Sequence, residues 1–328
     1  MSFSRFRRLL TGFIACSAVL LGGAQAAPRY PSLTLAGPSS VVTYPLIHMV
    51  ETQALAEHVG KLEFRLWQNP DQLRVLLAKK EIDYSAAPST VPALMFNKGE
   101  TVKLLNISVW GILWLVSRDP QVRSFADLSG QELLVPFQRD LPAVLLDTLL
   151  DQQRSAGLEP VRLRRTRDVQ DAVALMLTGQ GRHALLLEPM VSMLLSRAKE
   201  QGVALYRGDS LEQAWRQAFP RQAELPQAGI MANAHIAHDT ELNQAVERAY
   251  AQSAAWCQEQ PLACAQMVHR YLPQFPVPAI ESAIRQTRLD SRPALQLRPQ
   301  LEALYGLLGN TYPQAIGGRL PDVGFYGP

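Results

Sequence analysis

The sequence predicts an α/β fold arranged in two lobes, and three observations support this prediction. The chain has 328 residues, of which 47% are hydrophobic and 19% are charged, a globular composition with room for two domains. Short strand-like stretches alternate with helix-like stretches along most of the chain. This alternation completes one cycle before Asp119-Pro120 and starts a second cycle after it.

The first cycle predicts the first part of lobe 1, residues 27–118. The stretch "GPSSVVTYPL" at 37–46 ends a short apolar strand and begins an apolar pattern with helical spacing. Asn69-Pro70-Asp71 is typical of a helix N-terminus. Gly111 lies in the middle of the most apolar run and favours two strands or one bent strand. The expected strands are 33–36, 62–67, 82–87 and 102–117, and the expected helices are 44–59 and 72–79.

The second cycle predicts lobe 2 over residues 119–228, and the chain then returns to lobe 1 and ends in helices over 229–328. The stretch "AGIMANAHIA" at 228–237 is the strand expected to lead back. In sheets of this kind, ligands bind beyond the carboxyl ends of the strands, where helix N-termini point. The expected strands are 133–137, 161–163 and 184–187, and the expected helices are 141–153, 168–178, 190–199, 210–218, 240–258, 261–271, 278–285 and 299–308.

The first 26 residues are predicted to be a secretion signal. Arg5, Arg7 and Arg8 form a basic start, an apolar stretch of signal-peptide length follows, and Ala24-Gln25-Ala26 is a small-x-small cleavage pattern. The pattern predicts cleavage after Ala26 and export to the periplasm. Export by the general or by the twin-arginine route stays open.

Removal of this leader also changes the net charge. The whole chain is +3, and the leader carries three arginines and no acidic residue, so the mature protein is 3 − 3 = 0. A chain without basic excess gives no reason to expect nucleic-acid binding.

Two cysteines, Cys257 and Cys264, remain in the mature chain. In an exported protein such a pair predicts a disulfide, with two free buried thiols as the alternative. Their spacing is not one used for metal binding.

Several stretches, in this order, resemble the periplasmic solute-binding proteins of ABC importers. They are "GPSSVVTYPL", "KKEIDYSAAPST", "SFADLSGQELLVP", "ALLLEPMVSMLL" and "AWCQEQPLACAQMVHRYL". The group they resemble binds nitrate, sulfonates, taurine and thiamine-pyrimidine precursors. The resemblance implies a two-lobed, type II-like periplasmic-binding-protein fold, with a mixed sheet flanked by helices in each lobe and a helical C-terminal third. It also implies a monomer that closes on one small molecule and delivers it to a membrane permease with its ATPase subunit.

The resemblance implies that the ligand lies at the first residues after several strands. In lobe 1 these include Ser39 and Ser40, whose hydroxyls can bind an anion or cap a helix. Ser89 and Thr90 repeat this arrangement after a later strand. Trp67 can stack on a flat ligand or belong to the core.

Four more candidates lie near the crossing between the lobes or in lobe 2. Trp110 is near the crossing and is expected to line the cleft or the core. Gln138 and Arg139 stand between a strand and a helix, and Arg139 can pair with an anion, although Asp140 beside it can neutralise it or cap the helix. Glu188 follows a strand and favours an amine or hydroxyl donor, with a helix N-terminal acid as the alternative.

These candidates favour different ligands, so the sequence predicts a small organic solute, sulfonate-like or heterocyclic, above inorganic nitrate. No catalytic motif, cofactor fingerprint or metal-binding cluster is expected, so the chain is predicted to be a binding protein and not an enzyme. Two alternatives are a periplasmic ligand-sensing subunit for a membrane receptor and an enzyme similar to thiamine-pyrimidine synthases.

Overall fold

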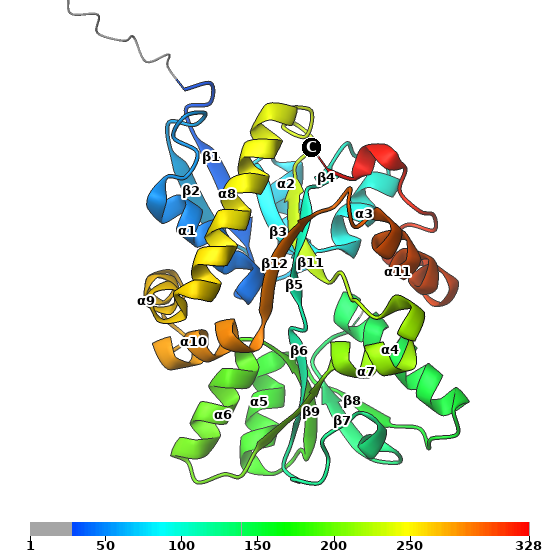
Figure 1. The fold of residues 1–328 in the computed structure, drawn as a ribbon. Coiled ribbons are helices and arrows are strands. Elements are labelled where there is room, and N and C mark those ends of the chain that lie inside the picture. The colour runs from blue at the N-terminus through cyan, green and yellow to red at the C-terminus, as the bar shows by residue number, and fades with distance from the viewer. Residues whose placement is uncertain (1–27, 139, 328) are drawn as a thin grey trace, which may run out of the picture.

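Two β-sheets, each covered by helices, form the two lobes of the protein (Figure 1). The computed structural model describes residues 28–138 and 140–327. The predicted leader, residues 1–26, lies outside this range, so its cleavage after Ala26 stays a prediction.

The first sheet has seven strands and mixes parallel with antiparallel pairs. Its order is β12-β5-β11-β3-β1-β2, with β4 paired to β11. β1 pairs in parallel with β2 and β3, whereas β11 is antiparallel to β3 and β5. Its strands are β1 (Leu33–Gly37), β2 (Leu62–Leu66), β3 (Tyr84–Pro88), β4 (Lys103–Leu104), β5 (Asn106–Trp110), β11 (Ala228–Ala232) and β12 (Arg288–Pro293).

The second sheet has five strands in the order β10-β6-β9-β7-β8. β7 pairs in parallel with β8 and β9, and β6 runs antiparallel to β9 and β10. Its strands are β6 (Leu113–Ser117), β7 (Glu132–Val135), β8 (Arg162–Arg165), β9 (His183–Leu187) and β10 (Tyr206–Ser210).

The helices follow the strands in the alternation that the sequence predicts. Around the first sheet are α1 (Tyr44–Thr52), α2 (Pro70–Ala78), α3 (Thr90–Asn97), α8 (Thr240–Glu259), α9 (Pro261–Tyr271), α10 (Val277–Gln286) and α11 (Arg298–Thr311). Around the second sheet are α4 (Leu141–Ser155), α5 (Val169–Thr178), α6 (Met190–Glu200) and α7 (Leu211–Ala218). The short 3-10 turns are η1 (Val41–Thr43), η2 (Ala126–Leu128), η3 (Pro220–Gln222), η4 (Pro313–Ala315) and η5 (Val323–Phe325).

The chain crosses between the sheets at Gly111-Ile112, where β5 ends and β6 begins (Figure 1). Gly111 has a φ of +71°, which a glycine adopts without strain. The crossing therefore falls earlier than the boundary after residue 118 that we expect from the sequence, and β6 belongs to the second sheet. The chain returns through the segment between η3 and β11.

Two local differences from the sequence prediction have clear physical causes. The first helix ends at Thr52 instead of extending to residue 59, because Gln53 is in the left-handed conformation and its side chain bonds to both backbone groups of Leu62. β12 was not expected from its charged sequence "RLDSRP", but Arg288 and Arg292 lay their guanidinium groups over the Trp110 ring of the neighbouring strand.

Cys257 and Cys264 form the disulfide that the sequence predicts. It joins the last turn of α8 to the first turn of α9, and both cysteines are fully buried.

Candidate functional site

The carboxyl ends of the parallel strands in both sheets face the boundary between the lobes. In the first sheet β5 runs in the same direction as β3, because both are antiparallel to β11. In the second sheet β6 enters from that boundary and β9 runs back towards it. The loops after β1, β3, β7 and β9 therefore meet near the Gly111 crossing, at the place where the sequence predicts the ligand.

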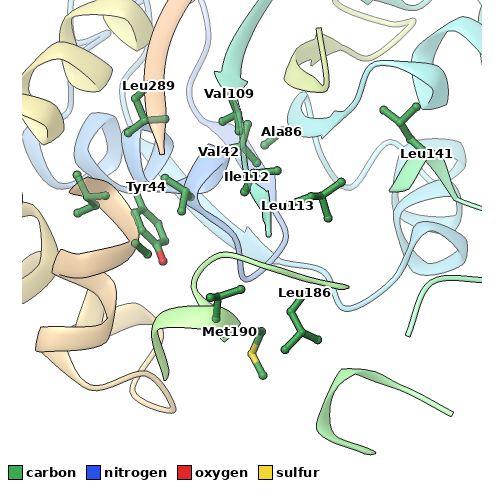
Figure 2. Close-up of a cluster of buried hydrophobic side chains, with 14 of the residues drawn as sticks. Val42, Tyr44, Ala86, Val109, Ile112, Leu113, Leu141, Leu186, Met190 and Leu289 are labelled. Atoms are coloured by element: carbon green, nitrogen blue, oxygen red, sulfur yellow. The ribbon is translucent and has the colours of Figure 1, made fainter. Parts of the chain in front are cut away.

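Apolar side chains from both lobes fill this boundary and form one continuous buried cluster. Figure 2 shows it in close-up, with Leu186 and Met190 of the second lobe below Tyr44 and Ile112. We call this set the interlobe cluster: Val42, Tyr44, Ala86, Val109 and Ile112 from the first lobe, and Leu113, Leu141, Leu186 and Met190 from the second.

Two buried hydrogen-bond donors at this boundary have no acceptor among residues 28–138 and 140–327. One is the hydroxyl of Tyr44, the first residue of α1, and the other is the Nε2 amide of Gln227. The Gln227 side chain reaches the crossing, where its Oε1 accepts a bond from the Ile112 amide at 3.4 Å. Buried donors without partners are rare in proteins and favour a site where a ligand acceptor can bind.

A charged residue of the second lobe, Glu188, also affects the pKa of the Tyr44 hydroxyl. Burial raises the pKa of Tyr44 well above its usual value, and the negative charge of Glu188 raises it further. The hydroxyl therefore stays protonated and acts as a hydrogen-bond donor at neutral pH.

Glu188 is fully buried at the end of β9 and already has several partners. Its Oε1 lies 2.5 Å from Nη1 of Arg207, at an angle outside that of a hydrogen bond. Its two oxygens also accept bonds from the Ser192 backbone amide at 3.1 Å and from the Ser192 hydroxyl at 3.0 Å. A ligand amine would have to compete with Arg207 for this carboxylate, so the ligand-binding role of Glu188 stays a prediction.

The serines and the threonine predicted in lobe 1 lie in the loops after β1 and β3. Ser39 is half-buried, and Ser40 precedes η1 without capping it through its side chain. Ser89 is fully buried, its hydroxyl donates to the Pro226 carbonyl at 2.8 Å, and Thr90 begins α3 beside it. The Ser89 hydroxyl thus has a protein acceptor, and the ligand-binding role of all four residues stays a prediction.

The two predicted tryptophans lie in hydrophobic cores. Trp67 packs in the cluster around Ala87, and its Nε1 donates to Ser85 Oγ at 3.0 Å. Trp110 packs in a third cluster, and its Nε1 donates to the Asp290 carbonyl at 2.9 Å. Side chains alternate along a strand, so the neighbour Val109 and not Trp110 joins the interlobe cluster. Stacking of either ring on a ligand stays a prediction without support from this placement.

The predicted loop after β7 is described only in part, because Arg139 lies outside the described residues. Gln138 is exposed, and its Nε2 donates to the Thr166 carbonyl at 3.0 Å. Asp140 precedes α4, and burial raises the pKa of its carboxyl group. The ligand-binding roles of Gln138 and Arg139 stay predictions.

The sequence interpretation missed Tyr44, Gln227 and Arg207. Tyr44 is in the quoted stretch "GPSSVVTYPL" and at the predicted start of the helix, but the candidates in this stretch come only from the residues directly after the strand. Gln227 directly precedes β11, which is antiparallel to its neighbours, so the start of this strand lies at the carboxyl ends of the others. Antiparallel pairing of this strand was the only signal that would have indicated Gln227.

Two searches of the described residues found nothing. No group of three or more histidine, cysteine, aspartate or glutamate side chains in residues 28–138 and 140–327 can hold a metal ion. Within the same ranges no helix is both long and apolar enough to span a membrane.

The fold is that of the two-lobed periplasmic binding proteins. It is similar to an ABC transporter structure from Parabacteroides distasonis, with a TM-score of 0.74 and 20% identity over 90% of this chain and 98% of that chain. It is also similar to the periplasmic aliphatic sulphonate binding protein SsuA from Escherichia coli, with a TM-score of 0.68 and 15% identity over 92% of this chain and 93% of that chain.

A third similar structure is the periplasmic nitrate-binding protein NrtA from Synechocystis PCC 6803, with a TM-score of 0.62 and 15% identity over 88% of this chain and 85% of that chain. No protein-family model matches the sequence, and no curated protein sequence is significantly similar to it. The similarity to solved structures confirms the predicted fold class.

Proposed function

We propose that this protein is the periplasmic solute-binding component of an ABC-type importer, which captures a small organic solute between its lobes and delivers it to a membrane permease. The observation that carries this proposal is the pair of buried donors, Tyr44 Oη and Gln227 Nε2, at the boundary between the lobes. The similarity of the fold to binding proteins of importers supports it. A ligand that contacts both lobes would favour the closed arrangement over the open one.

The chemistry of the boundary favours a solute with an aliphatic body and an oxygen-rich head. The interlobe cluster consists of aliphatic side chains and methionine around the single tyrosine ring. Tyr44 Oη and Gln227 Nε2 are donors, which fit the oxygens of a sulfonate or carboxylate, although the buried carboxylate oxygens Asp140 Oδ1 and Glu212 Oε1 also lack hydrogen-bond partners among the described residues. Both predicted tryptophans are packed in cores, so a flat heterocycle has less support than a sulfonate-like solute.

A thermal-shift screen of the purified protein tests the proposal. The panel contains alkanesulfonates, carboxylates, phosphonates, pyrimidines and polyamines. A ligand at about a hundred times its Kd adds about 2.7 kcal/mol to the free energy of unfolding, which a melting curve detects. We expect an alkanesulfonate or carboxylate to raise Tm; if no compound in the panel does so, the proposal is wrong.

Replacement of Tyr44 by phenylalanine then tests the position of the site. Tyr44→Phe keeps the ring and removes the donor, so the Kd of the compound found in the screen should rise by about five- to tenfold. Tyr326→Phe is the matched control, because its hydroxyl is also buried and unpartnered among the described residues but lies in a different cluster of the first lobe. An equal Kd in wild type and Tyr44→Phe, measured by calorimetry, would place the site elsewhere.

The proposal includes the periplasm as the location, a monomer as the working state, and a permease with its ATPase subunit as partners. The predicted leader and the fold support these points. A pull-down that recovers a permease supports import, whereas recovery of a membrane receptor without a permease would favour a ligand-sensing subunit.

A further inference from the structure

The second lobe carries an open groove that the proposed function does not use. Its volume is about 630 Å³, within the range of about 300–1,000 Å³ that is typical of small-molecule sites. The groove lies between the last turns of α6, the segment 203–207 and the loop that holds Pro120 and Arg123. We call it the α6–β10 groove.

The lining of the α6–β10 groove combines apolar and cationic side chains. Leu195, Val203 and Leu205 are half-buried and supply apolar surface. Arg123 and Lys199 are exposed, and neither forms an ion pair with another residue in the described part of the chain. None of the residues that line the groove is acidic.

Asp127, Glu200 and Asp209 are close to lining residues along the chain, but none of the three lines the groove. Asp127 accepts bonds from the backbone amides of Arg123 and Ser124. Arg207, the third cation of the lining, is paired with Glu188. Arg123 and Lys199 therefore supply the net positive charge of the groove.

We propose that the α6–β10 groove is a second binding site and that it takes a small organic anion with an aliphatic body. The two unpaired cations complement the anionic group, and the three aliphatic side chains complement the body. A purely inorganic anion would leave the apolar part of the lining without contacts, and a neutral alkane would leave both cations without a partner.

This site is distinct from the interlobe site, and the inference does not rest on the proposed function. Arg207 stands between the two places, because it lines the groove and pairs with Glu188 at the end of β9. No residue of the interlobe cluster lines the groove. Both sites can therefore be occupied in one molecule, and substitutions can disable them separately.

Calorimetric titration with sodium octanoate tests the inference, with octylamine and octan-1-ol as cationic and neutral probes of the same chain length. We expect octanoate to bind the wild-type protein and both other probes to bind at least about tenfold more weakly, because they lack the anionic group. Octanoate binding to the double variant Arg123→Gln, Lys199→Gln should likewise weaken by about tenfold.

The double variant Lys79→Gln, Arg162→Gln is the matched control. It removes the same charge from two exposed residues that are also without ion pairs among the described residues, and it should bind octanoate like the wild type. Absence of octanoate binding by the wild type would overturn the inference. So would an affinity that Tyr44→Phe lowers and the groove variant leaves unchanged, because octanoate would then occupy the interlobe site and the proposed function would be supported instead.

Discussion

The carboxylate of Glu188 and the guanidinium of Arg207 form a charge pair inside the second lobe. Glu188 is fully buried, and the Arg207 side chain is 17% exposed. Arg207 also lies over the ring of Trp114, 4.8 Å from its centre, and donates to Ser192 Oγ at 3.1 Å. Removal of one partner leaves the other charge buried without compensation, which costs far more than the loss of a surface pair.

Replacement of Arg207 by glutamine should therefore destabilise the protein by about 3–5 kcal/mol. Urea unfolding measures the change. Arg164→Gln is the control, because its 3.6 Å pair with Glu132 is exposed and should contribute at most about 1 kcal/mol. Addition of Glu188→Gln to the Arg207 variant should restore part of the loss. Equal costs for Arg207→Gln and Arg164→Gln would contradict a buried charge pair.

Gly111 at the crossing between the sheets has two reasons to be a glycine. Its φ is +71°, and a Cβ atom would lie 2.7 Å from Oε2 of the buried Glu212. Gly202 has a similar φ of +67° but open space around the position of a Cβ. An alanine at Gly202 would meet only the backbone strain, whereas an alanine at Gly111 would meet both the strain and the contact with Glu212.

Gly111→Ala and Gly202→Ala should each lower the free energy of unfolding by about 1 kcal/mol, because alanine is strained in the left-handed backbone conformation. Gly111→Ala should cost up to about 1 kcal/mol more, because the carboxylate end of the buried Glu212 side chain must move. Urea unfolding of the two variants side by side measures the difference. If the two alanine variants are equally stable, Glu212 moves freely and the crossing tolerates a side chain.

At the scale of elements, the sequence pattern predicted the helices and strands whose bounds depend on residues nearby in the sequence. Helix α9 agrees residue for residue with its prediction, because Pro261 marks its start and its apolar spacing is regular. The end of α1 was not predictable, because it depends on the bond between Gln53 and Leu62 of the next strand. Strand β12 could not be predicted from its own residues, because its arginines are stabilised by Trp110, a residue far away in the sequence.

The disulfide joins two consecutive helices, α8 and α9, and restricts a short loop. The double variant Cys257→Ala, Cys264→Ala should lower the free energy of unfolding by about 2–3 kcal/mol, the loop-entropy value for a loop of this length. Urea unfolding measures the loss, and wild type in the presence of a reductant is the control. A change below about 0.5 kcal/mol would show that helix packing already fixes the loop.

At the scale of the whole molecule, the sequence predicted which strand ends meet at one boundary but not which side chains lie there. The alternation of strands and helices brought the correct strand ends to one boundary. It could not decide which side chain of each strand faces that boundary, as the exchange of Trp110 for Val109 shows. Partners far apart in sequence, such as Glu188 and Arg207 or Tyr312 and Asp147, follow from tertiary packing alone.

Two polar contacts hold the lobes together on either side of the interlobe cluster. Tyr312, just after α11, donates to Oδ2 of Asp147 in α4 at 3.1 Å. Ser282 Oγ of α10 lies 2.9 Å from Ser192 Oγ of α6. Because each contact joins the first lobe to the second, separation of the lobes at that point would break it.

The double variant Ser282→Ala, Tyr312→Phe should therefore shift the protein towards an open arrangement. Each bond contributes about 0.5–1.5 kcal/mol, so together they change the ratio of closed to open molecules by about fivefold or more. Small-angle X-ray scattering should then report a larger radius of gyration than for the wild type. Tyr30→Phe is the control, since its 2.6 Å bond to Asp239 lies within the first lobe and its loss should lower stability without changing the radius. A radius unchanged in the double variant would mean that the remaining contacts, such as the apolar interlobe cluster and the pair of Arg288 with Glu212, are enough to keep the lobes together.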